Sequence, residues 1–450
     1  MAAGKRFAVR SGGHCAEAFV SAPENEVIID LSSMAAVEFD RKHGAFMIEP
    51  GATLGQVYRI LYQNWGVTIP AGFCVGVGAG GHICGGGYGA LARQFGLSAD
   101  HLYAVEVVVV NKRGAVSAVV ATRDEQDPNR ELWWAHTGGG GGNFGIVTRY
   151  WLRSPEVRGT KPDDLLPSPP SSLNFAELTW SWQELDQRAF TTLVRNFNGW
   201  HLRNSAVDSP YVGLTAYLTC AHQASGGVTL TVHVAAEAVN ADRTLDTFVE
   251  DATAGVGGAP SVKRQTLPWL AATRYLSPPD AGTGSVGIRR KVKAADLRGA
   301  HTDQQIATAY RYLTSPDYTG FGSLEYVGYG GKVNAVAPDA TATVHRSTLV
   351  KTFYSAAWED AAADEKHMRW IQEFYRDMHA ETGGVPVPDE TNAGSFINYP
   401  DIDLADLEWN KSGVPWYTFY YGENYPRLQR IKARWDPKDL FRHTLSIRPS

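Results

Sequence analysis

The stretch from Gly72 to Gly89, GFCVGVGAGGHICGGGYG, constrains the fold of this chain more than any other, because nine of its eighteen residues are glycine. Glycine has no Cβ, so a glycine-dense loop can bring its backbone close to a ligand or to another loop. Two cysteines, a histidine and a tyrosine lie within the same stretch. The chain therefore places reactive side chains inside a loop that is suited to enclosing a ligand.

Two further glycine loops occur, RSGGH at 10–14 and TGGGGGNFG at 137–145. Unhindered backbone N–H groups in such loops form concavities that hold phosphates. No Gly-Lys-Ser/Thr sequence follows 138–142 or 85–87, and no cluster opens a dinucleotide-binding βαβ unit, so neither a P-loop nor a Rossmann site is predicted. The three loops together are suited to wrapping an extended dinucleotide. The alternative is that the glycines only form tight turns in a β-rich protein.

Composition excludes several classes of protein. The net charge of −5 over 450 residues argues against a partner with a phosphate backbone, so no nucleic acid is expected. No apolar run is long enough to span a membrane, and the N-terminus lacks the apolar core of a signal peptide. Four cysteines are too few for a disulfide scaffold. A cytoplasmic enzyme with no membrane partner is the expectation, as a monomer or a dimer.

Periodicity predicts an α+β fold. The first third alternates strand-like runs with a helix at 53–66, whose start carries the capping-box pair Thr53 and Gln56. The proline-rich segment 154–172 is the expected domain boundary. Beyond it, strand-like runs alternate with amphipathic helices, of which 360–384 is the clearest, and this order predicts an antiparallel sheet with helices on one side. Strands are expected at 6–10, 26–32, 45–51, 228–239, 323–331 and 347–358, with a hairpin at 103–121.

The ordered motifs resemble one known family. RSGGHC, followed at a fixed spacing by GFCVGVGAGGHICGGGYG, resembles the vanillyl-alcohol-oxidase superfamily and, within it, the berberine-bridge-enzyme-like oxidases. The segments EPGATL, LWWAHTGGGGGNFGIVT, GYGGKVN, INYPDIDL and YYGENYPRLQRIKARWDP extend this resemblance over nearly the whole chain. VPVP, SGVPW and GGHICGGGYG resemble most the hexose oxidase of teicoplanin-type lipoglycopeptide biosynthesis.

The resemblance implies a two-domain FAD-binding fold of the PCMH type. Residues 1–165 and 395–450 would form a discontinuous FAD-binding domain, and 166–394 a substrate domain whose antiparallel sheet covers the flavin. Family members carry a longer segment before the RSGGH loop, so the first FAD subdomain is expected to be truncated and the strand at 6–10 to expose an edge.

The resemblance also implies the site residues. FAD would be attached twice, through His14 to the flavin 8α-methyl group and through Cys74 to flavin C6. Tyr399 would be the catalytic base facing flavin N5, assisted by Tyr88, although either ring could instead only pack in the core. A phenol needs a neighbouring donor or positive potential to act at neutral pH. The other expected FAD contacts are Arg10, Ser11, Gly12, Gly13, Gly78, Gly81, His82, Gly85, Gly142, Asn143, Gly145 and Val147.

Other uses of these side chains are weaker. Zinc would require His14, Cys15, Cys74, His82 and Cys84 to converge, but only the His82–Cys84 pair has close spacing, so no metal is expected. Tyr326, Tyr329, Tyr354 and Trp358 fit either a cleft lining or a sheet core.

The implied reaction is the FAD-dependent oxidation of a primary alcohol on a glycosylated natural product. By the likeness above, the alcohol is C6 of a hexose attached to a glycopeptide, taken to the aldehyde and carboxylate while O₂ is reduced to H₂O₂. Two alternatives stay open. The chain could oxidise another secondary metabolite or oligosaccharide alcohol, or it could be a truncated, non-catalytic protein that binds the antibiotic.

Overall fold

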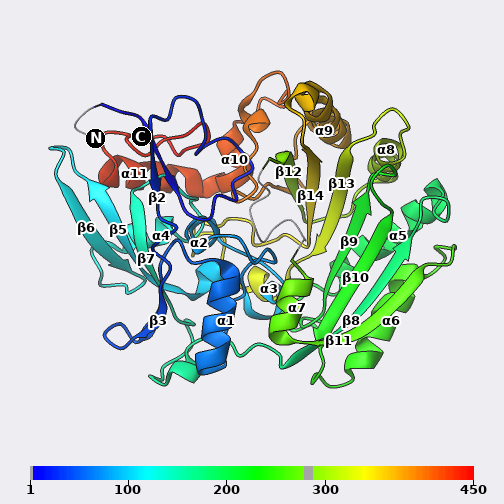
Figure 1. Cartoon of the computed structure of the whole chain (residues 1–450), viewed down its shortest axis with the longest axis horizontal. Helices are drawn as coiled ribbons and strands as arrows, with labels where there is room; N and C mark the ends of the chain where they lie inside the picture. Colours follow the sequence, from blue (N-terminus) through cyan, green and yellow to red (C-terminus); the bar gives the residue numbers. More distant parts are fainter. Residues whose placement is uncertain (1–3, 278–286) are drawn as a thin grey trace.

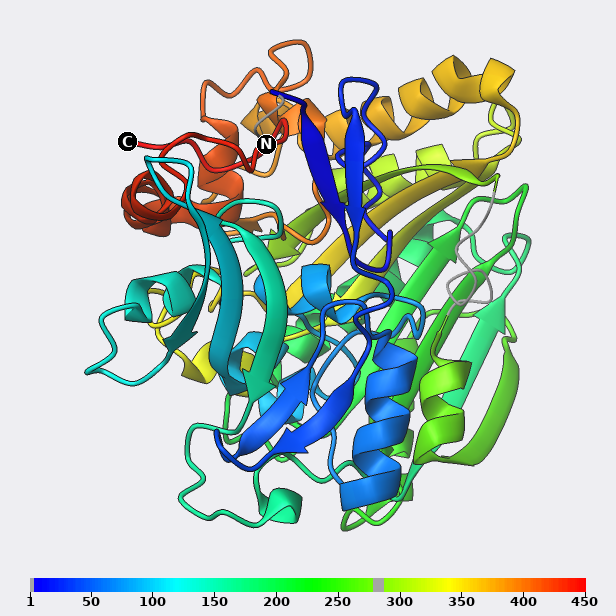
Figure 2. The same cartoon turned by 60° about the vertical axis from the view of Figure 1, so that its left-hand side comes forward.

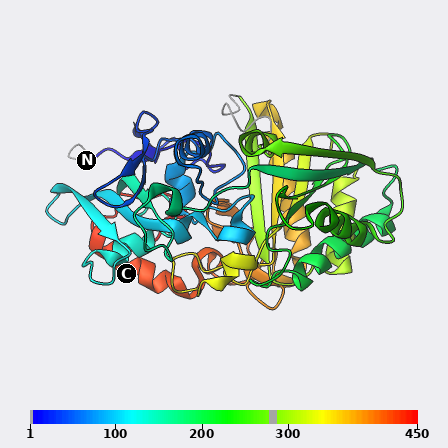
Figure 3. The same cartoon turned by 90° about the horizontal axis from the view of Figure 1, so that it is seen from below.

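The computed structural model describes residues 4–277 and 287–450. Two parts lie side by side, and both chain ends are in the part built around β5, β6 and β7 (Figures 1 and 3). Its five strands are ordered β3-β4-β7-β5-β6 and pair antiparallel throughout. Their bounds are β3 (Val37–Asp40), β4 (Ala45–Ile48), β5 (Leu102–Val110), β6 (Val116–Thr122) and β7 (Ile146–Leu152).

A small parallel pair of strands precedes this sheet in the chain. β1 (Phe7–Arg10) pairs with β2 (Val27–Asp30), and in Figure 2 the two stand apart from the five-stranded sheet. β2 exposes Val27 and Ile28 to 40% and 50%. Apolar side chains are therefore exposed beside β1, the strand from which an open edge was expected.

Short helices complete the first part. α1 begins after Thr53, whose hydroxyl accepts from the Gln56 N–H while the Gln56 side chain accepts from the Thr53 N–H, so the predicted capping box is confirmed. Gly66 ends α1 at φ 68°, in the left-handed conformation that glycine tolerates. The helices are α1 (Leu54–Trp65), α2 (Ala79–Cys84), α3 (Ala92–Phe95), α4 (Arg130–Ala135), α10 (Trp416–Tyr421) and α11 (Tyr425–Trp435).

An eight-stranded sheet forms the second part, in the order β11-β8-β10-β9-β13-β14-β12-β15, with every neighbouring pair antiparallel. The predicted PCMH-type α+β fold with an antiparallel sheet is confirmed. The strands are β8 (Ser172–Trp180), β9 (Thr215–Ala221), β10 (Val228–Ala235), β11 (Ser261–Pro268), β12 (Arg289–Leu297), β13 (Phe321–Gly328), β14 (Val350–Trp358) and β15 (Asn392–Gly394).

Helices cover one face of this sheet, and Figure 3 shows the green helices of residues 187–253 on the side away from the first part. The helices on this face are α5 (Gln187–Arg203), α6 (Ala241–Thr253), α8 (Asp303–Leu313) and α9 (Asp364–Met378), whereas α7 (Trp269–Tyr275) lies on the other face of the sheet, where Tyr275 donates to Glu177 of β8. Side chains alternate between the faces of a strand. On β13, Leu324 and Tyr326 are therefore buried in the core, while Ser323 and Glu325 line a cavity on the other face.

The last segment of the chain returns to the first part. In α11, Lys432 Nζ donates to the backbone oxygen of Asn143 at 2.7 Å and pairs with Asp436 at 2.6 Å, with no solvent exposure of either charged side chain. The Ile447 N–H donates to Asn143 Oδ1 at 2.8 Å. These contacts brace the glycine loop at 137–145 from behind.

Candidate active site

A cavity of about 1050 Å³ lies where the three glycine loops meet the open face of the eight-stranded sheet. One wall is backbone-rich and comes from segments 10–16, 72–82 and 140–145, which lie far apart in the sequence. The opposite wall consists of side chains from β8, β9, β10, β12, β13 and β14. A volume of this size accommodates a large cofactor together with a substrate.

Two of the glycine loops touch each other through their backbones. A Cβ added at Gly78 would collide with the backbone N of Gly12, and one added at Gly12 would collide with Gly78 in turn. Gly81 differs, because a Cβ there would meet nothing within 4 Å. Since Gly81 lines the cavity, its bare backbone forms a cradle with space in front of it.

Almost all of the predicted cofactor residues line this one cavity. They are Arg10, Ser11, Gly12, Gly13, His14, Cys74, Gly78, Gly81, His82, Gly142, Asn143, Gly145 and Val147. Gly85 is the exception, because the space that its Cβ would fill is occupied by the amide of Asn398. Asn398 Nδ2 also donates to the backbone oxygen of His82 at 3.0 Å. Gly85 therefore lets the FINYPD turn pack against α2, and its contact with the cofactor stays a prediction.

His14 and Cys74 reach the same cavity from two different loops. Both side chains are partly buried, and Cys74 forms no disulfide. Burial raises the pKa of the Cys74 thiol to about 11, with a smaller contribution from the charge of Glu325. Cys74 is therefore a neutral thiol at pH 7 in the ligand-free chain.

The other candidate zinc ligands are engaged elsewhere. His82 Nε2 accepts from the Gly72 N–H at 3.1 Å, and burial lowers the pKa of His82 to about 4, so the ring is neutral and braces the Cys74 loop. The Cys84 thiol is buried and donates to the Gly80 oxygen at 3.0 Å. Within residues 4–277 and 287–450, no three His, Cys, Asp or Glu side chains are arranged to hold a metal.

The two predicted catalytic tyrosines are joined directly. The hydroxyls of Tyr88 and Tyr399 are 2.9 Å apart, although 311 positions separate the residues in sequence. Tyr399 packs on Phe353 of β14 with ring centroids 4.7 Å apart, and both tyrosines pack edge-on against Phe396. The pair therefore lies at the junction of the glycine loops and the sheet, and both of its rings line the cavity.

Burial raises the pKa of both phenols. With Tyr88 as the donor, their shared hydrogen bond acts in the opposite direction on Tyr399 and favours its phenolate. A cation is close, since Lys351 Nζ lies 5.1 Å from the centre of the Tyr88 ring. Its charge is balanced by Asp296 at 2.6 Å, so Lys351 supplies little net positive potential.

A buried ion cluster, which the sequence analysis did not identify, holds both reactive loops. We call it the lysine clamp: Lys291 and Lys293 of β12 with Glu17, Asp401 and Asp403. Lys291 contacts Glu17, three residues after His14, and Asp401, two residues after Tyr399, the latter at 2.8 Å. Lys293 bridges Asp401 and Asp403, each at 2.7 Å. The matching spacings K-x-K and D-x-D were the sequence signal.

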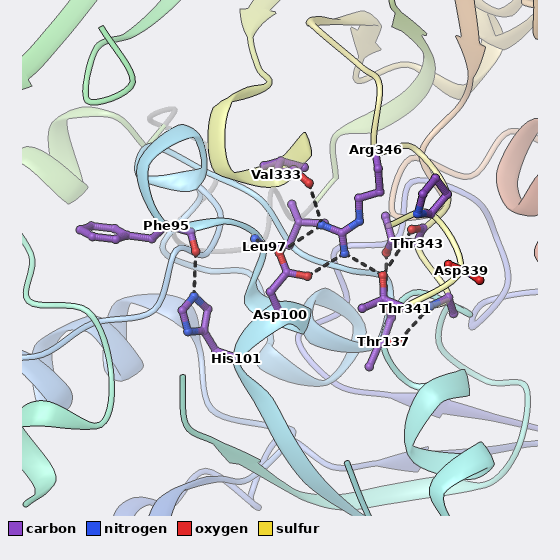
Figure 4. Close-up of polar contacts among 12 residues, drawn as sticks. Phe95, Leu97, Asp100, His101, Thr137, Val333, Asp339, Thr341, Thr343 and Arg346 are labelled. Carbon is purple, nitrogen blue, oxygen red and sulfur yellow. Dashed lines mark hydrogen bonds and ion pairs between the residues drawn. The ribbon is translucent and has the colours of Figure 1, made fainter. Parts of the chain in front are cut away.

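A second buried pair, Arg346 with Asp100, lies near the start of the third glycine loop (Figure 4). Arg346 donates to Asp100 at 2.6 Å and to the Thr341 hydroxyl at 2.7 Å. The nearby Thr343 hydroxyl donates to the Thr137 oxygen at 3.0 Å, at the start of the third glycine loop. Arg346 thus holds the 341–343 segment, which in turn contacts the start of this loop.

The sheet face resolves the four ambiguous aromatic residues. Trp358, at the end of β14, lies on the same face as Tyr354 and stacks on His367 of α9 with ring centroids 5.0 Å apart, although it also borders the cavity. Tyr326 and Tyr354 point away from the cavity and are fully buried in the core. Tyr329 is buried behind Tyr88, with ring centroids 5.5 Å apart. Of the four, only Trp358 contributes to the cavity wall.

These features fit FAD as a ligand. The cradle at Gly81 has room for a group in contact with the backbone, and three loops with bare glycines line the same cavity. An imidazole, a thiol and a pair of phenols line the same cavity.

Among the described residues, no helix is both long and apolar enough to cross a membrane.

Comparison with known proteins agrees with this geometry. A family profile described as "FAD binding domain" matches residues 1–116, and one described as "Berberine and berberine like" matches residues 395–448. Aclacinomycin-N/aclacinomycin-A oxidase of Streptomyces galilaeus is 52% identical over 449 residues, which cover 100% of this chain and 82% of that protein.

Two solved structures are similar over the whole chain. A flavoenzyme of shunt product recycling in caerulomycin biosynthesis has a TM-score of 0.97 at 58% identity, covering 100% of this chain and 90% of the other. A glycopeptide hexose oxidase complexed with teicoplanin has a TM-score of 0.96 at 48% identity, covering 100% and 89%. The sequence resemblance is confirmed, and the likeness to the glycopeptide oxidase is shared with relatives of higher identity.

Proposed function

Because this chain belongs to the berberine-bridge-enzyme-like family of FAD-linked oxidases, we propose that it oxidises an alcohol of a glycosylated natural product. The observation that carries the proposal is the Tyr88–Tyr399 hydroxyl pair in the cavity that the glycine loops share with the sheet. A ligand that contacts both the glycine loops and the sheet would lie next to this pair, which offers a proton acceptor for its reacting group.

The residues that would hold the cofactor come from three loops of the first part. Glycines of the 10–14, 72–82 and 137–145 loops would contact FAD through their backbones, while His14 and Cys74 would each form a covalent bond to the flavin. When bound, FAD supplies the hydride acceptor for alcohol oxidation and the route by which the electrons reach O₂. Two attachments would retain the cofactor even in a cavity open to a bulky substrate.

The tyrosine pair would move the alcohol proton. In its phenolate form Tyr399 would accept the O–H proton of the substrate as the C–H bond breaks, and Tyr88 would stabilise that phenolate by donating a hydrogen bond to it. The raised pKa of Tyr399 in the ligand-free chain means that this donation has to overcome a burial penalty. The Asn398 contact with α2 and the lysine clamp fix the position of the Tyr399 turn from both sides.

The reacting group that we propose first is the C6 hydroxymethyl of a hexose on a glycopeptide, converted to the aldehyde and then to the carboxylate. The glycopeptide hexose oxidase supports this choice by its likeness over the full chain. A second candidate is an alcohol of another secondary metabolite, which is favoured by the higher identity to the aclacinomycin oxidase and the caerulomycin flavoenzyme.

Oxygen uptake and H₂O₂ release across a substrate panel test the proposal. The panel comprises a glycosylated lipoglycopeptide, an aclacinomycin, free glucose and an oligosaccharide. Turnover of the glycopeptide supports C6 oxidation if the mass of the product shows that one hydroxymethyl group of the sugar has become an aldehyde or a carboxylate. Turnover of the aclacinomycin alone supports the second candidate. A colourless protein that binds the glycopeptide without consuming O₂ would instead indicate a non-catalytic binding protein.

A further inference from the structure

One cavity-lining carboxyl is not accounted for by the proposed reaction. Glu325 lies on β13 with its side chain on the open face of the sheet. In register, it stands opposite Thr219 of β9 on one side and Phe353 of β14 on the other. Directly opposed residues in a sheet have Cβ atoms about 5 Å apart. Because Tyr399 packs on the Phe353 ring, Glu325 is one strand away from the base.

Among the residues that the structure describes, Glu325 has no side-chain partner. Within the described ranges its carboxyl makes no hydrogen bond and no ion pair, and only the charge of Arg290 acts on it. The neighbouring buried acids are all paired with cations: Asp296 with Lys351, Asp100 with Arg346 and Asp401 with Lys293. Glu325 is partly exposed to the cavity, so water can solvate its carboxyl until a ligand displaces that water, and the carboxyl would then need a partner on the ligand.

The charge around Glu325 points to the chemistry of that ligand. The substrate side of the cavity carries three carboxyls, Glu177, Glu325 and Glu359, and one guanidinium, Arg290. Glu177 is already engaged, since the Tyr275 hydroxyl donates to it at 2.8 Å. Burial raises the pKa of Glu325 to about 7, and an ammonium group bound against it would reverse that shift. An excess of negative charge beside an unsatisfied carboxyl favours a cationic ligand over a neutral one.

We propose that Glu325 is a specificity-determining residue that binds a protonated amine of the substrate, so that the preferred substrate carries an amino sugar or a similar basic group near its reacting alcohol. This inference rests on the proposed oxidation of a sugar-bearing natural product, whose substrate class it narrows. It assigns Glu325 a role in binding and none in the proton transfer.

Calorimetric titration of the FAD-loaded protein at pH 7 tests it with 6-deoxy-D-glucosamine and 6-deoxy-D-glucose. These probes differ at C2 by an amine against a hydroxyl, and neither has the C6 alcohol, so binding is read apart from turnover. The wild type should bind the amino sugar about 10-fold to 100-fold more tightly, the range expected of one hydrogen bond between charged groups. E325Q should bind the two sugars within about twofold of each other.

E177Q is the matched control. It removes a carboxyl from the same face of the sheet, but that carboxyl already accepts a hydrogen bond from Tyr275. It should keep the amine preference. E325L repeats the test if the amide of E325Q forms a new hydrogen bond, and FAD absorbance confirms that each variant is folded. Equal binding of the two sugars by the wild type, binding of neither, or an unchanged preference in both Glu325 variants would overturn the inference. If the protein takes up no oxygen with any sugar that keeps its C6 alcohol, while the preference for the amine persists, the result would count against the proposed oxidation and leave the role of Glu325 in binding intact.

Discussion

Removing Lys291 from the lysine clamp should destabilise the chain and release both reactive loops together. In K291M, Glu17 and Asp401 would be left buried with a single remaining cation, Lys293, for three carboxyls. The side chains of Lys291, Glu17 and Asp401 are only 3%, 8% and 1% exposed, so the buried-pair range of about 3–5 kcal/mol applies rather than the surface range of about 0–1 kcal/mol.

The effect on thermal unfolding follows from chain length. An unfolding entropy of about 2.1 cal/mol/K per residue gives about 0.9 kcal/mol/K for 450 residues. A loss of 3–5 kcal/mol therefore corresponds to a decrease in Tm of about 3–5 °C if the two parts unfold together. Differential scanning calorimetry at pH 7 measures this decrease. Hydrogen exchange of the same samples should show segments 11–20 and 396–404 losing protection together, because Lys291 joins them.

R289M on the same strand is the control. Arg289 pairs with Asp364 at the surface, where the two side chains are 44% and 38% exposed, so its loss should lower Tm by less than about 1 °C. If K291M and R289M lower Tm equally, or if only one of the two segments loses protection in K291M, the clamp does not couple the loops and the reasoning is wrong.

Other substitutions and conditions test separate parts of the account. Y399F should lower the maximal rate about 10²–10⁴-fold with FAD still bound, and Y88F should lower it less, as rapid-mixing kinetics would show; equal rates in Y399F and the wild type would remove Tyr399 as the base. G78A should prevent FAD loading, since its Cβ would strike the Gly12 backbone, whereas G159A, with nothing within 4 Å, should load normally; a yellow G78A protein would contradict the packing. Acid should destabilise the fold steeply between pH 6.5 and 4, because each buried neutral histidine binds a proton readily when unfolded but not when folded, so protons favour the unfolded state. A Tm that stays flat over this range would refute that expectation. Burial lowers the pKa to about 4 for His82, His136, His301 and His443, and to about 3 for His201, His233 and His379.

Local chemistry made part of the fold predictable. The capping box at Thr53 and the glycine stop at Gly66 fix both ends of α1 from sequence alone. β3 (Val37–Asp40) was missed because it is short and its residues are only partly buried, so no clear alternation marks it. The predicted helix 360–384 is α9 (Asp364–Met378) with short turns at either end, where helix-forming residues continue past the hydrogen-bonded core.

The candidate site, too, could be predicted only in part from the sequence. Motif order identified the Tyr88 and Tyr399 positions, but their hydrogen bond is a long-range contact that a single sequence does not show. The missing Cβ of Gly85 makes room for Asn398, a packing role that the sequence did not show, while its predicted contact with the cofactor stays a prediction. Lys291 and Lys293 alternate along β12 as solvent-facing residues do. Both are nevertheless buried, because each forms an ion pair with an aspartate 110 positions further along the chain. Glu325 of β13 also has the pattern of a solvent-facing residue, although it lines the cavity.

The most direct test of the central claim is the intact mass of the denatured protein, followed by a peptide map. A mass gain of one FAD is expected, with the flavin carried by the peptides of both His14 and Cys74. An unshifted mass with no flavin released on denaturation would contradict it, because the cavity between the glycine loops and the sheet would then not be a flavin site.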